Sequence, residues 1–164
     1  MTISIRGASA RDRTQCIEML NTLGAATGSG QRPFSKAVFE QLVSGERGAV
    51  ALAEEAGLTL GMVTVSYNLA LRFDGEYCQL EELVVLPQAR GKRLGGLLLQ
   101  HAIDAARTRG CADMGLYLIE STTHNQPFYE KFGFIAVGAE MRQRLSTTLL
   151  DNTFPSDGSN EPAG

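Results

Sequence analysis

Residues 83–102 read LVVLPQARGKRLGGLLLQHA, an apolar strand followed by a basic, glycine-rich loop and then a helix. Backbone N–H groups at a helix start have no intrahelical acceptor, and the helix dipole favours negative charge there. Glycines in such a loop let an anion approach the backbone closely. Arg90, Lys92 and Arg93 add charge-assisted hydrogen bonds, which are stronger than neutral ones. The stretch therefore predicts a phosphate site at the junction of a sheet and a helix.

Two common phosphate-binding loops do not match this stretch. A Walker loop needs Gly-Lys followed by Ser or Thr, and neither tripeptide occurs in the chain. The dinucleotide pattern G-x-G-x-x-G is absent as well. The alternative to a phosphate site is that the stretch is only a basic loop before an ordinary core helix.

The rest of the chain alternates between strand-like and helix-like periods on both sides of this junction. The pattern predicts the order β-α-α-β-β-β-α-β-α-β-β, an α/β (mixed, α+β-like) fold. Its core would be one central mixed sheet of about seven strands flanked by about four helices. The expected strands are 2–6, 49–54, 58–71, 78–85, 114–119, 134–139 and 140–146.

Length and composition limit the possibilities. With 164 residues, 43% of them hydrophobic, the chain has room for one domain, which we place at 1–149. Residues 150–164 are polar and contain Pro and Gly, so we expect a disordered tail. The net charge of −3 argues against a nucleic-acid binder with a broad basic surface.

No apolar run has the length of a membrane span, and the first residues do not resemble a signal peptide. Cys16, Cys78 and Cys111 are odd in number and scattered, which suggests small core residues rather than disulfides or a zinc site. We therefore expect a cytoplasmic protein without a metal and without a membrane partner.

A second motif follows about thirty residues later, HNQPFYEKFGF at residues 124–134. Asn125 is suited to cap a helix and Pro127 to its first turn. Asn125 and Tyr129 are four residues apart, so they would share a helix face.

Together the two motifs resemble those of the GNAT superfamily of acetyl-CoA-dependent N-acetyltransferases. The first family motif is [QR]-x-x-G-x-[GA] after a strand, and here it reads Arg90-x-x-Arg93-x-Gly95. Arg93 replaces the middle glycine of the motif. A negative φ, as in a first helical turn, would accommodate this arginine. The motifs cover residues 78–134, and the order of elements fits the family over residues 2–146.

The resemblance implies acetyl-CoA as the cosubstrate. Leu83 and Val85 would present backbone groups to the pantetheine and the acetyl group, and residues 90–96 would hold the pyrophosphate. Asn125 would contact the pantetheine arm, and Tyr129 would lie beside the thioester sulfur. The full predicted cosubstrate site is Leu83, Val84, Val85, Arg90, Gly91, Lys92, Arg93, Leu94, Gly95, Gly96, Asn125, Phe128 and Tyr129.

Acetylation of an amine is helped by an acid that protonates the leaving thiolate and a base that deprotonates the amine. A phenol with a pKa near 10 can protonate a thiolate that leaves with a pKa of about 8.5, so Tyr129 is the candidate acid. A lysine-like amine is neutral to only about 1 part in 2,500 at pH 7, a handicap of roughly 4.6 kcal/mol, so a base is expected. Glu81 and Glu82 are the candidates, and strand alternation lets only one of them face the acceptor.

We favour Glu81 as the base, on the face that would also carry Leu83 and Val85, with Glu120 as a further candidate. A solvent-facing glutamate and a tyrosine in a helix–sheet core are the purely structural interpretations of these residues. The family resemblance leaves three functions open. The first is direct transfer of acetyl to a primary amine of a small molecule. The second is acetylation of a protein N-terminus or lysine, and the third is a non-catalytic CoA-binding sensor. Dimers are common in the family, so a homodimer is a candidate assembly.

Overall fold

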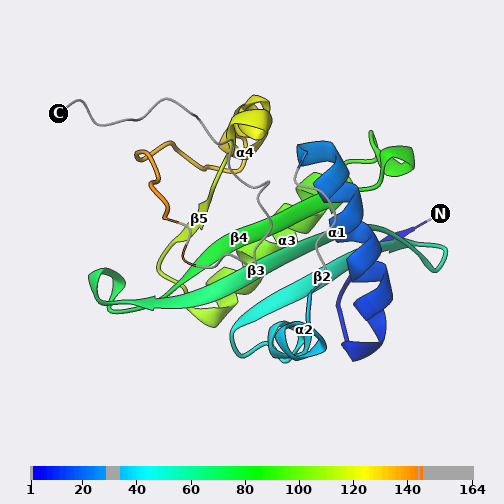
Figure 1. Ribbon diagram of the computed structural model, residues 1–164, viewed down its shortest axis with the longest axis horizontal. Coiled ribbons are helices and arrows are strands. Elements are labelled where there is room, and N and C mark those ends of the chain that lie inside the picture. Colours follow the sequence, from blue (N-terminus) through cyan, green and yellow to red (C-terminus); the bar gives the residue numbers. More distant parts are fainter. Residues whose placement is uncertain (1, 29–33, 144, 146–164) are drawn as a thin grey trace.

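The computed structural model describes residues 2–28, 34–143 and 145, and these form one sheet with helices on both faces (Figure 1). Five strands lie in the order β1-β2-β3-β4-β5. All neighbours are antiparallel except β4 and β5, which run parallel. The strands are β1 (Ile3–Gly7), β2 (Gly48–Glu55), β3 (Leu58–Ala70), β4 (Gly75–Val85) and β5 (Met114–Leu116).

Helices cover the two faces of this sheet separately. α1 (Arg13–Thr27) and α2 (Lys36–Val43) pack on one face, and α3 (Leu94–Arg109) packs on the other (Figure 1). The short helix α4 (Gln126–Glu130) follows β5 through the 3-10 turn Glu120–Asn125. The mixed α/β fold predicted from the sequence is thus confirmed.

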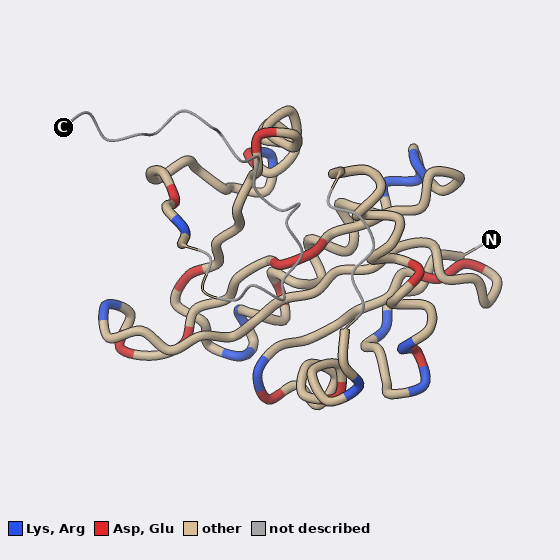
Figure 2. Tube along the Cα trace, viewed as in Figure 1, with Lys and Arg blue, Asp and Glu red and all other residues tan. Residues whose placement is uncertain are grey.

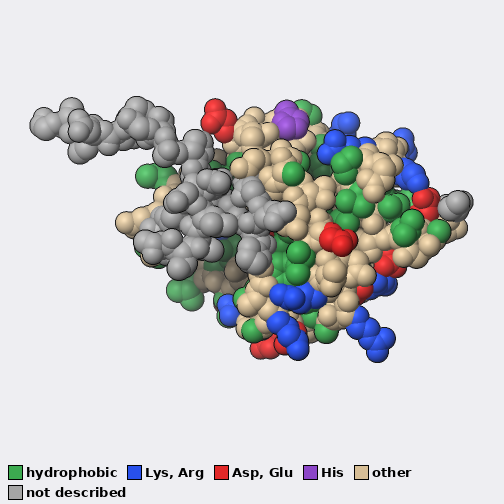
Figure 3. All heavy atoms as spheres, turned by 45° about the vertical axis from the view of Figure 1, so that its right-hand side comes forward, with side chains coloured by type: hydrophobic (Ala, Val, Ile, Leu, Met, Phe, Trp, Pro, Cys, Tyr) green, Lys and Arg blue, Asp and Glu red, His purple; other side chains and the backbone are tan. Residues whose placement is uncertain are grey.

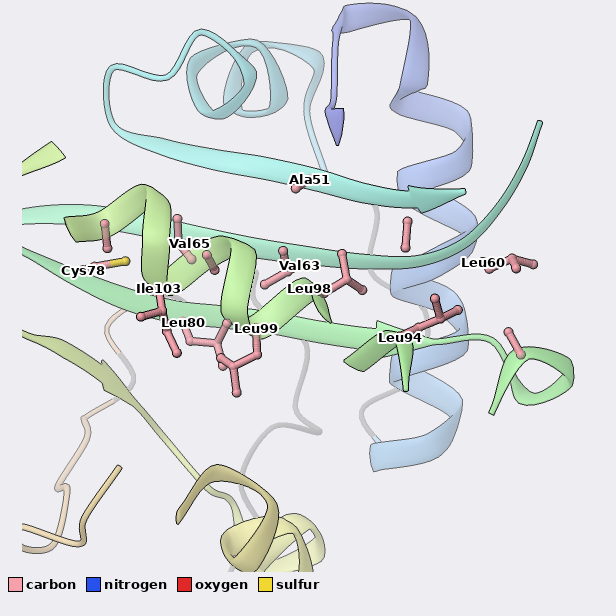
Figure 4. Packing of buried hydrophobic residues seen from close by; sticks show 14 residues of the cluster. Ala51, Leu60, Val63, Val65, Cys78, Leu80, Leu94, Leu98, Leu99 and Ile103 are labelled. Atoms are coloured by element: carbon pink, nitrogen blue, oxygen red, sulfur yellow. The ribbon is translucent and has the colours of Figure 1, made fainter. Parts of the chain in front are cut away.

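The core under α3 is the larger of two hydrophobic clusters. Leu94, Leu98 and Leu99 are fully buried against β3 and β4 (Figure 4). Burying a leucine side chain contributes about 1.5–3 kcal/mol to stability, so these residues fix the position of the helix start firmly. The second cluster lies under α1 and α2 and includes Leu52, Met62 and Val84.

The 3-10 turn Ala10–Asp12, which leads directly into α1, is held by charged and capping hydrogen bonds. Ser9 and Asp12 form a capping box, in which the Asp12 carboxylate accepts a hydrogen bond from the Ser9 N–H at 2.7 Å. Asp12 also accepts two hydrogen bonds from the Arg6 guanidinium, at 2.8 and 2.9 Å, and Arg6 donates two more to Glu54. These bonds hold the pKa of Asp12 well below its usual range.

The expectation of about seven strands was wrong for the closing pair. Residues 134–143 form no strand, and Ile135, Val137 and Met141 are 79%, 90% and 94% exposed. A further edge strand must hydrogen-bond to the backbone of its neighbour, here β5, and β5 has only three residues available for pairing. Part of the second expected strand, 140–146, and the whole expected tail, 150–164, lie outside the described residues.

Candidate active site

The centre of β4 contains a β-bulge. Glu82 lies opposite Thr64, and Leu80 lies opposite Val65, so Glu81 is an extra residue without a partner on β3. A bulge of this kind interrupts the alternation of side chains along the strand. Both glutamates therefore point to the face covered by α1 and α2, and Figure 2 shows this acidic stretch near the middle of the sheet.

The bulge overturns two expectations. Alternation predicted that only one glutamate faces the acceptor, whereas both lie on the same face. It also predicted that Glu81 shares a face with Leu83 and Val85, which instead pack into the cluster under α3. Val84 is buried on the opposite face, among the residues under α1 and α2.

Hydroxyl groups of β3 hold the two carboxylates. The Thr64 hydroxyl donates to the Glu82 carboxylate and accepts a hydrogen bond from the Glu82 N–H at 3.1 Å. The Ser66 hydroxyl donates to the Glu81 carboxylate at 2.5 Å and accepts from the Asn68 amide at 3.1 Å. Sequence reasoning missed Thr64 and Ser66. Their alternation in the otherwise apolar stretch MVTVSYN was the available signal.

Strands β4 and β5 separate at the bulge. Their pairing ends at Leu80 and Leu116, while β4 continues to Val85 with no strand beside it on that side in the described part of the chain. The backbone from 81 to 85 is thus a free sheet edge, and such an edge presents unpaired N–H and C=O groups to a ligand. This is the segment in which the family resemblance places the pantetheine contacts.

A gap opens where β4 and β5 separate, and helix α4 contributes aromatic side chains to one side of it. The Tyr129 ring contacts Phe128 and Phe134 edge-to-face, with centroid distances of 5.1 and 6.0 Å. Burial raises the pKa of the Tyr129 hydroxyl above its ordinary value. Asn125 precedes the helix, but its side chain makes no capping hydrogen bond, contrary to the expectation that it caps. Glu120, the further base candidate, is exposed in the preceding turn.

The basic loop lies beyond the end of β4. Figure 2 marks its Lys and Arg positions in blue along the trace at one end of the molecule, and Figure 3 shows Lys and Arg side chains at that end. Residues 90–93 are all exposed. The first hydrogen bond of α3 runs from the Leu97 N–H to the Arg93 carbonyl at 3.2 Å. The N–H groups of Leu94, Gly95 and Gly96 are therefore unused within the helix and available to an anion.

Arg93 differs from expectation in its backbone. Its φ is +60°, in the left-handed region, where the sequence argument required a negative value. This conformation suits glycine, which the family motif has at this position, and it costs an arginine roughly 1–2 kcal/mol. Gly91 also has a positive φ, +86°, and open space around its α-carbon.

Two glycines at the start of α3 have a further role. A methyl group on Gly96 would lie 3.1 Å from the Phe132 ring, and one on Gly95 would lie 3.7 Å from the Phe128 ring. The small residues thus let the aromatic side chains next to the gap pack closely against α3. The Lys92 ammonium forms an ion pair with Glu55 at 2.5 Å, so one charge of the basic loop is partly engaged.

Comparisons with known proteins agree with this geometry. The profile of the Acetyltransferase (GNAT) family matches residues 17–134. The chain belongs to this family. It is also similar to glucosamine 6-phosphate N-acetyltransferase 1 of Oryza sativa subsp. japonica, with 30% identity over 128 residues, 75% of this chain and 74% of the rice protein.

Two further similarities concern a shorter segment and the fold. A Trypanosoma brucei brucei glucosamine 6-phosphate N-acetyltransferase is 36% identical over 66 residues, which are 40% of this chain and 43% of that protein. The crystal structure of the Arabidopsis thaliana glucosamine-6-phosphate N-acetyltransferase superposes with a TM-score of 0.71 at 25% identity, covering 89% of this chain and all of that one (100%). The GNAT fold and the acyltransferase class of the enzyme are thus established.

Proposed function

We propose that this GNAT protein transfers acetyl from acetyl-CoA to the primary amine of a small molecule by direct attack in a ternary complex. The observation that carries the proposal is the gap between β4 and β5, with a basic loop at one end and two carboxylates on the far face of the sheet. A linear cosubstrate can span this gap from its phosphates to its reactive end. An amine can then approach from the side of α1 and α2.

The residues fit the cosubstrate. Exposed Arg90 and Arg93, together with the unused N–H groups of the first turn of α3, form a donor set for a pyrophosphate. When bound, acetyl-CoA supplies an acetyl thioester at the free edge of β4. Leu83 and Val85 contribute backbone groups there, because this part of β4 has no described strand on its β5 side, while their side chains pack toward α3.

The proton transfers are assigned to the chain's own side chains. In the reaction a C–N bond forms and the C–S bond breaks. An acceptor that arrives as an ammonium gives up two protons, of which the leaving thiolate takes one and a carboxylate takes the other and passes it to solvent. Tyr129 is the proposed acid, and its raised pKa keeps the hydroxyl protonated at neutral pH. Glu82 or Glu81 accepts the amine proton, directly or through water.

The relatives suggest the first acceptor to test. Two of them are named glucosamine 6-phosphate N-acetyltransferases, so glucosamine 6-phosphate heads the list of amines. A protein amine is the second candidate. The predicted cytoplasmic location and the candidate homodimer belong to the same proposal.

Binding and turnover are tested separately. Acetyl-CoA at 100 times its Kd should add about 2.7 kcal/mol to stability, which corresponds to roughly 5–10 °C in melting temperature. Release of free thiol with each amine then measures turnover. A melting temperature unchanged at millimolar acetyl-CoA would refute the cosubstrate assignment, and binding of acetyl-CoA without turnover of any small-molecule amine would refute the proposed acceptor class.

The acid is tested by Tyr129→Phe, with Tyr77→Phe as the matched control outside the site. We expect Tyr129→Phe to lower kcat by roughly 10²-fold or more at pH 7, with the acetyl-CoA melting shift retained. Tyr77→Phe should keep kcat within about twofold, because substitutions away from a site have small effects. Equal rates for the two variants would remove Tyr129 from the acid role.

A further inference from the structure

Two side chains of β3, those of Ser66 and Asn68, form a chain of hydrogen bonds that ends at the Glu81 carboxylate. The Asn68 amide donates to the Ser66 hydroxyl at 3.1 Å, and the Ser66 hydroxyl donates to Glu81 at 2.5 Å. A serine hydroxyl has a single hydrogen. Because Asn68 meets this hydroxyl as a donor, that hydrogen is directed to Glu81. The Asn68 side chain therefore fixes the direction of the hydrogen bond that Glu81 accepts.

The backbone that carries this chain of hydrogen bonds lies inside the sheet. At Ser66, β3 is paired on both sides, with Gly48 of β2 and with Gln79 of β4, and Asn68 lies two residues further along the same strand. A catalytic group must be held within about 0.5 Å of its productive position, and residues on strands do this more precisely than residues on loops. Ser66 thus reaches Glu81 from a fixed position, diagonally across the bulge.

Glu81 is a residue whose carboxylate needs such a support. It is exposed, and it is the extra residue of the bulge, so no residue of β3 lies directly opposite it. An exposed glutamate has three rotatable side-chain bonds and changes rotamer readily. The hydrogen bond from Ser66 selects among these rotamers. It holds the carboxylate on the face of α1 and α2, next to Leu80, where the pairing of β4 with β5 ends.

The neighbouring Glu82 is held by a different hydroxyl and in a different way. Thr64 donates to the Glu82 carboxylate and also accepts from the Glu82 N–H at 3.1 Å, so these two residues are joined through side chain and backbone together. Thr64 is only 6% exposed. This pair holds β3 and β4 together beside the bulge, whereas the Ser66 hydroxyl contacts the carboxylate of an exposed residue. The two hydroxyls therefore have separate roles.

We propose that Ser66 and Asn68 are positioning residues, which hold the Glu81 carboxylate in the orientation that accepts a proton from the acceptor amine. The inference rests on the proposed acetyltransferase function and assigns the role of base to Glu81. The bond from Ser66 occupies one carboxylate oxygen, Oε1, and the second oxygen serves the amine. Asn68 acts through Ser66, and Ser66 acts through Glu81, so neither needs to touch the substrate.

The test is a double-mutant cycle between Ser66 and Glu81. Thiol release gives kcat and the KM for acetyl-CoA, with the best acceptor among glucosamine 6-phosphate, spermidine and lysine. We expect Ser66→Ala to lower kcat about 10-fold or more, part of the roughly 10²- to 10⁴-fold that a positioned base contributes, and to keep the KM for acetyl-CoA within about twofold. In the Glu81→Gln background the same substitution should change kcat by less than about twofold, because no base is left to position.

Variants that retain or divert the hydroxyl hydrogen separate positioning from folding. Ser66→Thr keeps a hydroxyl on a residue that favours strands, so kcat should stay within about threefold. Asn68→Asp replaces the donor by an acceptor, which draws the hydrogen of Ser66 away from Glu81, so kcat should fall about as far as in Ser66→Ala. Ser4→Ala, on the exposed surface of β1, is the matched control and should keep kcat within about twofold.

Failure of this inference is distinguishable from failure of the proposed function. If the wild type acetylates an amine and Ser66→Ala is as fast, or is slowed equally with and without Glu81, the positioning role is overturned and the acetyltransferase function stands. An equal loss of kcat in Ser66→Thr and Ser66→Ala also overturns it, because the hydroxyl is then not the group that matters. Unchanged kcat in Asn68→Asp overturns the part of Asn68. If the wild type acetylates none of these amines, the proposed function fails and the inference falls with it.

Discussion

Replacing Arg93 by glycine should stabilise the protein, although it removes a side chain from the basic loop. Arg93 has φ +60°, and the left-handed conformation costs a non-glycine residue roughly 1–2 kcal/mol. Glycine removes this cost but gives the unfolded chain more freedom, which lowers stability by about 0.4–1 kcal/mol. The difference leaves a net gain of roughly 0.5–1 kcal/mol, or about 1–4 °C in melting temperature.

Alanine at the same position separates backbone from charge. Arg93→Ala also removes the guanidinium but keeps the left-handed strain, so it should melt below Arg93→Gly by about 2–4 °C. Arg90 provides the control, because its φ is −62° and it carries no such strain. There the order should reverse, with Arg90→Gly melting below Arg90→Ala.

Thermal melts of the four variants without acetyl-CoA are the assay. Acetyl-CoA titrations of the same samples should show weaker binding for both Arg93 variants, because each lacks one charged donor to the pyrophosphate. If Arg93→Gly melts at or below Arg93→Ala, the backbone argument is refuted. The loop would then not require a glycine-like conformation at this position.

Three further predictions concern charged groups. Glu55→Gln should tighten acetyl-CoA binding by about two- to fivefold in calorimetry, because it frees Lys92 from an exposed ion pair, while Glu40→Gln, on the distant surface of α2, should not. The pKa of Asp12 is well below its usual range, so this carboxylate contributes stability above about pH 4 that is lost as pH falls through its folded pKa. Melts from pH 6 to pH 3 should therefore show a smaller decline for Asp12→Asn than for the wild type, and equal slopes would contradict the assignment. Glu81→Gln and Glu82→Gln identify the base. The variant that removes the base should lower the rate mainly at low pH, where the amine is hardest to deprotonate. If the pH profiles of both variants run parallel to that of the wild type, neither glutamate is the base.

The sequence predicted the fold well because its strongest signals are local. The strand, loop and helix at 83–102 have clear periods and a characteristic order, and the structure places them as expected. The prediction of closing strands was wrong over the described residues 134–143, because alternation along the sequence indicates a pattern but not a partner strand, and β5 is too short to provide one.

The site was less predictable for a physical reason. A bulge depends on how two strands pair, so the residues of β4 alone could not show that Glu81 and Glu82 share a face. The φ of Arg93 likewise depends on how the loop joins α3 to the sheet. A cavity between the sheet and helices α1 and α2 is lined by residues of these two helices and of three strands, so no short sequence motif contains it.

The bulge also makes β4 unusually tolerant of losing one residue. Because Glu81 is the supernumerary position, its deletion would restore a regular strand and leave Leu80, Leu83 and Val85 on the side that they occupy now. Removing almost any other single residue of a strand moves every following side chain to the opposite face of the sheet. In this chain, a shortened strand keeps its core, loses one carboxylate and straightens where it parts from β5. Single-residue insertion is therefore a simple route by which a plain sheet could have acquired both its bend and its second acid.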